Sequence, residues 1–219
     1  MATLNLNALT TLADLKAELK ITVSTFDAYL TTLINVASDY ICTRTNRDLF
    51  YQTVTEAVPG FASTRLRVKQ TPIDTAKPIS ITFDSATIDP TIYTVENAKL
   101  GYLYNRNGWY WTAPLLPNVQ QDPYPGMENR LYTVTYTGGY YTPQQVVTLN
   151  PTPTYGQLLP ADIEQACISM CTWLYRHQGQ DPMIESERLL SYSVKYLTTM
   201  KLPLVEDVIA RYRRIGMSS

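Results

Sequence analysis

Two amphipathic stretches near opposite ends of the chain constrain its fold most strongly. In residues 26–41 and 160–174, apolar side chains recur every three or four residues, which is the period of one helix face. The two predicted stripes are Phe26, Leu30, Leu33 and Ala37, and Ile163, Cys167, Met170 and Leu174. A helix with a single apolar stripe must bury that stripe against another element. The sequence therefore predicts that the N-terminal and C-terminal helices pack together around one core.

Residues at the expected helix ends support these boundaries. Thr11 with Asp14, and Ser24 with Asp27, have the spacing of residues that cap the start of a helix. They predict a short helix after Thr11 and a longer one after Ser24. A last helix is predicted from Pro203, because acids lie early in it and arginines late, as the helix dipole favours.

The stretch between the N-terminal and C-terminal helical segments has a different pattern of residues. From about residue 48 to residue 148, Thr, Val, Ile and Tyr alternate between prolines and glycines, which is typical of short, half-buried strands. Asn105 to Gly108 favours a hairpin turn between strands at 100–104 and 109–111, and the proline-rich residues 114–126 favour a long loop. We therefore predict an α+β fold. A small helical bundle, formed by residues 1–47 and 151–219, carries an inserted antiparallel β domain, residues 48–150.

The sequence contains no recognisable set of catalytic or cofactor-binding residues. Its single histidine, His177, lies where a histidine commonly caps a helix end, and no nucleophile motif or phosphate-binding glycine loop accompanies it. Cys42, Cys167 and Cys171 lie on predicted apolar stripes and lack the usual spacing of zinc ligands. We therefore expect no enzyme activity, cofactor, metal or disulfide. No apolar run approaches the roughly 20 residues needed to span a membrane.

The composition fits either a protein that assembles with partners or a β-rich segment made of ordinary strand-forming residues. Charged residues make up only 17% of the 219 residues, below the roughly 25% usual in soluble domains, and tyrosine occurs 17 times. Tyrosine is amphipathic and loses little entropy on ordering, so it suits surfaces that become buried against a partner. The net charge of −1 gives no overall attraction to nucleic acid, although it leaves room for a local basic patch.

Two groups of residues are candidates for binding. The first is an aromatic cluster around the predicted hairpin, consisting of Tyr102, Tyr104, Trp109, Tyr110 and Trp111. Such aromatics stack on sugars, form a protein interface or pack the two faces of a β domain, and the sequence leaves all three roles open. The second is a basic cluster near the C-terminus, Arg211, Arg213 and Arg214, which is either a solvated helix end or an anchor at a partner or near DNA.

The order of these segments resembles the head–tail connector, or adaptor, proteins of tailed phages. The resemblance lies in the helix pair at 12–19 and 26–41 followed by Thr45-Asn46-Arg47, in Tyr136 to Tyr140 ahead of Leu159 to Cys167, and in the closing segments 187–196 and 202–214. It covers the helical ends and the borders of the strands. The β block is longer than in the smallest members of that family.

The resemblance implies a structural virion protein in the neck of a tailed phage, assembled in the host cytoplasm. It implies a twelvefold homo-oligomeric ring that docks beneath the portal protein and above a stopper or tail-completion protein, with DNA passing through the lumen without sequence-specific binding. We expect residues 202–219 to dock on the portal, and the expected interface residues are Leu204, Val208, Arg211, Tyr212, Arg213 and Arg214. The alternative is a virion-associated tail module that binds a carbohydrate or a receptor through the aromatic cluster.

Overall fold

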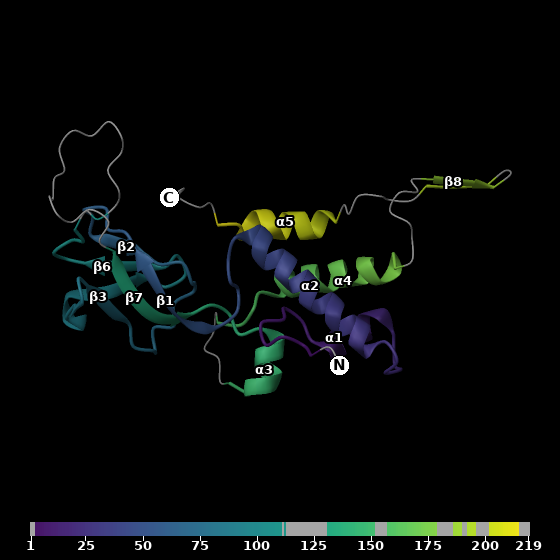
Figure 1. Cartoon of the computed structure of the whole chain (residues 1–219), viewed down its shortest axis with the longest axis horizontal. Helices are drawn as coiled ribbons and strands as arrows, with labels where there is room; N and C mark the ends of the chain where they lie inside the picture. The colour runs from purple at the N-terminus through teal and green to yellow at the C-terminus, as the bar shows by residue number, and fades with distance from the viewer. Residues whose placement is uncertain are drawn as a thin grey trace. The chain divides into compact units, whose positions relative to one another are not determined.

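The computed structural model describes residues 3–110, 112, 131–151, 157–178, 186–189, 192–195 and 202–214, without the side chains of 186–195 (Figure 1). The chain divides into two compact units. The helical unit comprises Met1–Arg47, Thr142–Pro151 and Leu159–Ser219, and the β unit comprises Asp48–Tyr141 and Thr152–Leu158. The residues of the predicted loop at 114–126, and Trp111, lie outside the described part.

The helical unit is built from helices contributed by both ends of the chain. They are α1 (Leu12–Leu19), α2 (Asp27–Thr45), α3 (Pro143–Leu149), α4 (Ala161–Arg176) and α5 (Pro203–Tyr212), and a short hairpin joins β8 (Ser186–Leu189) to β9 (Tyr192–Lys195). Helix α2 packs against α4 and α5, and α1 packs against α2 and α4. The predicted association of the N-terminal and C-terminal helices is therefore observed.

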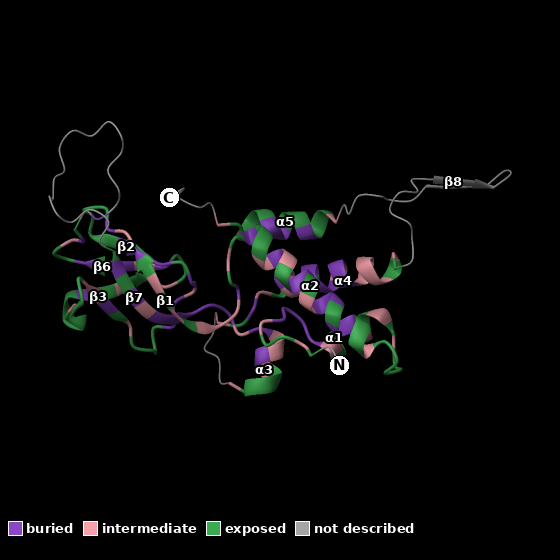
Figure 2. Ribbon diagram, in the orientation of Figure 1, coloured by how far each residue is buried: buried purple, intermediate pink, exposed green. Residues whose placement is uncertain are grey.

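Six of the eight residues of the two predicted stripes are buried in the core of the helical unit, and Leu174 is only partly buried. Burial on α2 and α4 is concentrated on one side of each helix (Figure 2). The buried residues of these two helices include Leu30, Leu33, Ile34, Ala37, Ile41, Ile163, Ala166, Cys167, Met170 and Cys171. Phe26 departs from the prediction, because it is 39% exposed and contacts the edge of Tyr175 instead of the core. Phe26 is the residue before the first turn of α2, and its ring contact with Tyr175 lies at the other end of α4 from the buried Ile163.

The helix ends agree with the sequence at α1 and differ from it at α2. The Thr11 hydroxyl accepts a hydrogen bond from the Asp14 backbone N–H, as predicted for a capping residue. At α2 the cap position is Phe26, and no side chain caps it. Ser24 contributes its backbone carbonyl, which accepts from the Asp27 N–H at 3.0 Å. The predicted side-chain cap at Ser24 is therefore wrong.

Helix α3 (Pro143–Leu149) lies where the sequence predicted the end of the β domain. Thr142 and Gln145 form a capping box, Pro143 occupies the first turn, and Asn150 ends the helix in the left-handed conformation. The segment contains two valines, which favour a strand, but it also carries a complete set of helix start and stop signals. This helix, α3, belongs to the helical unit.

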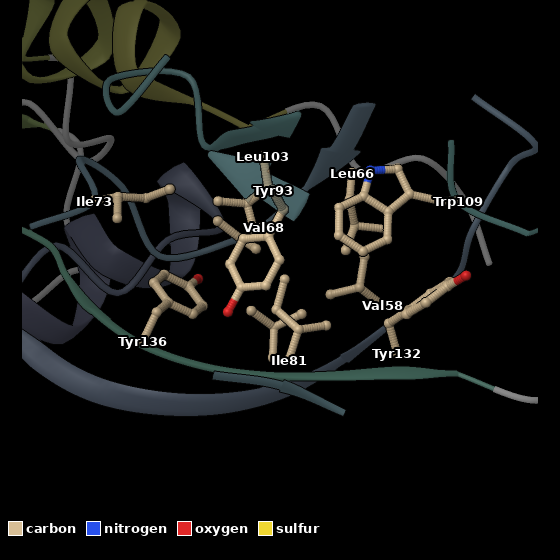
Figure 3. Packing of buried hydrophobic residues seen from close by; sticks show 11 residues of the cluster. Val58, Leu66, Val68, Ile73, Ile81, Tyr93, Leu103, Trp109, Tyr132 and Tyr136 are labelled. Carbon is tan, nitrogen blue, oxygen red and sulfur yellow. The ribbon is translucent and has the colours of Figure 1, made fainter. Parts of the chain in front are cut away.

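The β unit contains two antiparallel sheets that share one core. The strands are β1 (Gln52–Val58), β2 (Arg65–Arg67), β3 (Ser80–Phe83), β4 (Ala86–Thr87), β5 (Tyr93–Asn97), β6 (Tyr102–Asn105) and β7 (Tyr132–Gly138), with a 3-10 turn at Pro90–Ile92. One sheet has the order β1-β7-β3-β4, and the other has the order β2-β6-β5. Inward side chains of both sheets meet in one cluster that includes Leu66, Ile81, Leu103 and Tyr136 (Figure 3).

The predicted hairpin around residues 105–108 is wrong. Strand β6 pairs with β2 and β5, and the chain after Gly108 does not return along β6. Instead the Trp109 N–H donates to the Ser63 carbonyl, and the Thr112 N–H donates to the Gly60 carbonyl. Asn105 accepts from the Asn107 N–H through its side chain, so the turn that the sequence predicted is present but redirects the chain elsewhere.

Replacing Gly139 by alanine is expected to destabilise the β unit more than the same change at Gly108. Both glycines have a positive φ, which costs an alanine about 1–2 kcal/mol. A Cβ at Gly139 would lie 2.2 Å from the Phe50 carbonyl oxygen, whereas at Gly108 the nearest atom is 3.7 Å away. The clash adds about 1–3 kcal/mol. Equal urea midpoints for the two variants would contradict the close approach at Gly139.

Candidate docking surface

Helix α5 is attached to the helical unit by its own apolar stripe. Val205, Val208 and Ile209 are buried, and the helix packs against α4 and α2. Val208 is only 1% exposed, so it is not available to a partner in this conformation of the chain. We therefore remove Val208 from the predicted interface. The apolar stripe of α5 therefore buries the helix within its own unit.

Polar contacts fix the end of α5 to the first turn of α4. Arg211 Nη1 lies 2.8 Å from Asp162 Oδ2, and the Tyr212 hydroxyl donates to Asp162 Oδ1 at 3.0 Å. The backbone N–H of Arg214 donates to the carbonyl of Thr45, the last residue of α2, at 2.8 Å. Because Arg211 is largely exposed, its ion pair contributes little stability by itself. Together the three contacts orient the helix.

The remaining predicted residues lie on the surface of the helical unit. Leu204 is 44% exposed at the start of α5, and Arg213 is exposed just after its end. The exposed leucine offers an apolar contact at the start of α5, and the exposed arginine offers a charged contact just after its end. The predicted site is thus divided, with Leu204 and Arg213 outward and Val208 inward.

The predicted aromatic cluster of the β unit is divided in the same way. Trp109 is 2% exposed, its indole N–H donates to the Thr64 carbonyl at 3.2 Å, and its ring meets Tyr132 edge-on at 5.2 Å (Figure 3). It therefore packs the core. Tyr102 and Tyr104 point away from that core on β6, because Leu103 between them is buried. Tyr110 is exposed and follows Trp109 outside the strand.

The side chains that could carry chemistry have structural roles in the described part of the chain. His177 caps α4, with Nδ1 lying 2.8 Å from the Trp173 carbonyl, as predicted. Cys167 and Cys171 are buried free thiols, and a hydrogen bond between them together with burial raises the pKa of Cys171. A thiol with a raised pKa is a poor nucleophile. No group of three potential metal-ligating side chains occurs among the described residues.

Glu164, on the first turn of α4, is expected to make the helical unit less stable at neutral pH. Burial, and next the carboxylate of Asp14, raise the pKa of Glu164 above its usual value of 4.5. The folded state therefore holds the proton more tightly than the unfolded state, so stability falls as the pH rises through the raised pKa and stays lower above it. Glu164→Gln should raise the melting temperature at about pH 7 and leave it nearly unchanged at about pH 4. The exposed Glu18→Gln is the control, and an equal rise there would contradict the assignment.

Comparison with known proteins matches part of this chain to one family model and the whole chain to one fold. The model of the family described as Phage gp6-like head-tail connector protein matches residues 9–95, which confirms the resemblance seen in the sequence. This match covers α1, α2 and the β unit as far as β5, and so extends into the block that the resemblance had not covered. No curated protein matches the chain in sequence.

The whole chain shares its fold with proteins of two particle necks and one virion. A chain in "Neck of empty GTA particle computed with C6 symmetry" is 13% identical, with a TM-score of 0.55, over 100% of this chain and 96% of that one. A chain in "Virion of native gene transfer agent (GTA) particle" is 12% identical, with a TM-score of 0.55, over 99% and 95%. A third, in "Neck of native GTA particle computed with C12 symmetry", is 12% identical, with a TM-score of 0.53, over 100% and 96%. The predicted α+β class is confirmed, and the β unit has a counterpart in these chains.

Within the described residues, no helix has the length and apolar character that crossing a membrane requires.

Proposed function

We propose that this chain is a structural subunit of a ring in the neck of a tailed-phage-like particle, where it connects the DNA-filled head to the tail. The observation that carries the proposal is the family match at residues 9–95 together with a shared fold over the whole length of neck chains. One of those necks is described with C12 symmetry, which supports a twelvefold ring. The chain would act by shape and contact, without a chemical reaction.

The proposed ring joins a portal protein on one side and a stopper or tail-completion protein on the other. Copies in a closed ring meet through two different patches of each subunit, so that every copy binds its neighbour in the same way. For the portal contact we propose the outward residues of α5 and its end, Leu204 and Arg213. Leucine supplies apolar area, and arginine supplies a charge that remains partly hydrated at the rim of an interface.

Deleting the gene for this chain from the genome that encodes the particle tests this role. We expect DNA-filled heads and separate tails, because the head would lack the ring onto which the tail assembles. Purified full-length protein, added to such heads and tails, should restore tailed particles countable by electron microscopy. Normal yields of tailed particles without the chain would contradict the connector role.

A further inference from the structure

The two sheets of the β unit turn faces of different chemistry away from the core that they share. Leu66, Leu103 and Tyr136 meet in that core (Figure 3), so the alternate residues of their strands lie on the outward faces of the sheets. Because the core lies between the two sheets, the outward faces point in nearly opposite directions. The β unit can therefore contact two different molecules at once through its sheets.

The outward face of the four-stranded sheet is uncharged and built from small side chains. On β1 and β7 its residues, which we name the threonine face, are Thr53, Thr55, Ala57, Thr133, Thr135 and Thr137. The hydroxyls of Thr53 and Thr137 share a hydrogen bond of 2.8 Å, and those of Thr55 and Thr135 share another of the same length. A hydroxyl that has a partner within the sheet loses less when water leaves the surface. A partner can therefore cover this face at a low cost in desolvation.

The outward face of the three-stranded sheet carries large side chains that contact one another. Arg65 Nε and Nη2 lie 2.6 and 2.5 Å from the two carboxylate oxygens of Glu96. The Arg67 guanidinium lies 5.8 Å from the centre of the Tyr102 ring, within the range of a cation–π contact. Tyr104 is paired in register with Arg65 and is 37% exposed. We name these five residues the tyrosine face.

The tyrosine face has the composition of a protein interface. Tyrosine and arginine are enriched in interfaces and contribute a large share of their binding energy. The pair of Arg65 with Glu96 is exposed, so it adds little to the stability of the free β unit. It does, however, present a donor and an acceptor together in place of a separate charge. The face is thus suited to a partner that is itself uncharged.

We propose that the tyrosine face of one copy packs against the threonine face of the next copy in the ring. The inference rests on the proposed function, in which identical copies form a closed ring. Each copy in such a ring meets its two neighbours through two different patches, which lie on nearly opposite sides when the ring has many copies. The two sheets of the β unit provide that arrangement. Large side chains on one face fill the space above small ones on the other, as in the packing of two sheets.

The test is native mass spectrometry of the full-length chain bound to its portal protein, at an amount of chain that fills half of the positions. Copies that bind one another fill the portal cooperatively, so the unchanged chain should give empty portals and complete rings with few intermediates. Tyr104→Glu or Thr133→Glu places a charge in the contact between copies. Each variant should therefore lose cooperative filling and give one spread of masses centred on half-filled portals.

Tyr29→Glu and Thr32→Glu on α2 are the matched controls. Tyr29 is 38% exposed, which nearly equals the exposure of Tyr104, and Thr32 is exposed as Thr133 is. Both controls add the same charge as the face variants but lie in the helical unit. They should fill the portal cooperatively, as the unchanged chain does.

An equal mixture of the Tyr104→Glu and Thr133→Glu variants tests which faces meet. The first variant keeps its threonine face and the second keeps its tyrosine face, so one intact contact forms between the two. Copies should then occupy the portal in pairs with one of each variant, and even numbers of bound copies should exceed odd ones. This recovery would also show that both variants are folded.

The remaining outcomes contradict the inference in different ways. Cooperative filling by either face variant alone would show that the copies meet through another surface. Loss of cooperative filling in the controls as well would remove the assignment to the β unit. A mixture without pairs would show that the two faces do not meet each other. Failure of the unchanged chain to bind the portal at all would instead contradict the proposed function.

Discussion

Replacing Leu30 by alanine is expected to lower the free energy of unfolding of the helical unit by about 2–5 kcal/mol. Leu30 is fully buried on α2, the helix that packs against α1, α4 and α5. Removing its side chain leaves a cavity where elements from both ends of the chain meet. Urea unfolding followed by ellipticity at 222 nm measures the loss, because most of the helix lies in this unit.

The matched control is Val36→Ala on the same helix. Val36 is 50% exposed, so its truncation creates no buried cavity and should change the free energy of unfolding by about 0.5 kcal/mol or less. Because the chain has two units, the fluorescence of Trp109 should follow the β unit separately once Trp111 and Trp173 are replaced by Phe in all variants, and it should remain unchanged by both substitutions. A loss at Leu30 no larger than that at Val36 would contradict the shared core of the terminal helices.

Replacing Leu204 by aspartate is expected to weaken attachment to the portal and to leave filled heads without tails. The change places a charge where the proposed interface requires an apolar contact, and an anchor residue of this kind contributes about 2 kcal/mol or more. That loss corresponds to about a 30-fold lower affinity. Because Leu204 is exposed in the free chain, the fold should be retained, and the melting temperature should confirm this.

Val147→Asp is the control for the Leu204 variant. Val147 lies on α3 and is 71% exposed, so the substitution adds the same charge to an outward apolar position away from α5. The yield of tailed particles with this variant should equal that of the unchanged chain. The same loss of tails with both variants, or with neither, would show that α5 is not the docking element. Truncation before α5 is a poorer test, because it also removes Val205, Val208 and Ile209 from the core.

The sequence predicts most of the helical core, because the spacing of apolar residues along a helix indicates which of its faces is buried. The stripes of α2 and α4 place Leu30 and Cys167 inside, and Thr11 marks the start of α1. The periodicity does not identify the surface that buries a stripe. Val208 was predicted as an interface residue because it lies in the segment expected to dock, residues 202–219, although α5 buries it against its own unit.

Strand pairing was less predictable, because short-range signals do not determine which strands meet. The turn at Asn105 is present, but long-range hydrogen bonds to Gly60 and Ser63 direct the chain that follows, and these residues are far away in sequence. The valines of α3 favour a strand locally, and the capping box at Thr142 overrides that preference. The contact between Arg67 and Tyr102 was not predicted, because the two residues come from different strands and meet only through the register of β2 and β6.

Native mass spectrometry of the full-length chain mixed with its portal protein tests the central claim most directly. The connector account predicts that one portal ring gains a closed ring of twelve copies of the 24.8 kDa chain, and that the Leu204→Asp variant fails to add this mass. A ring of another closed number would correct the stoichiometry and keep the role. Single copies scattered on the portal, or no added mass at any protein concentration, would contradict the account.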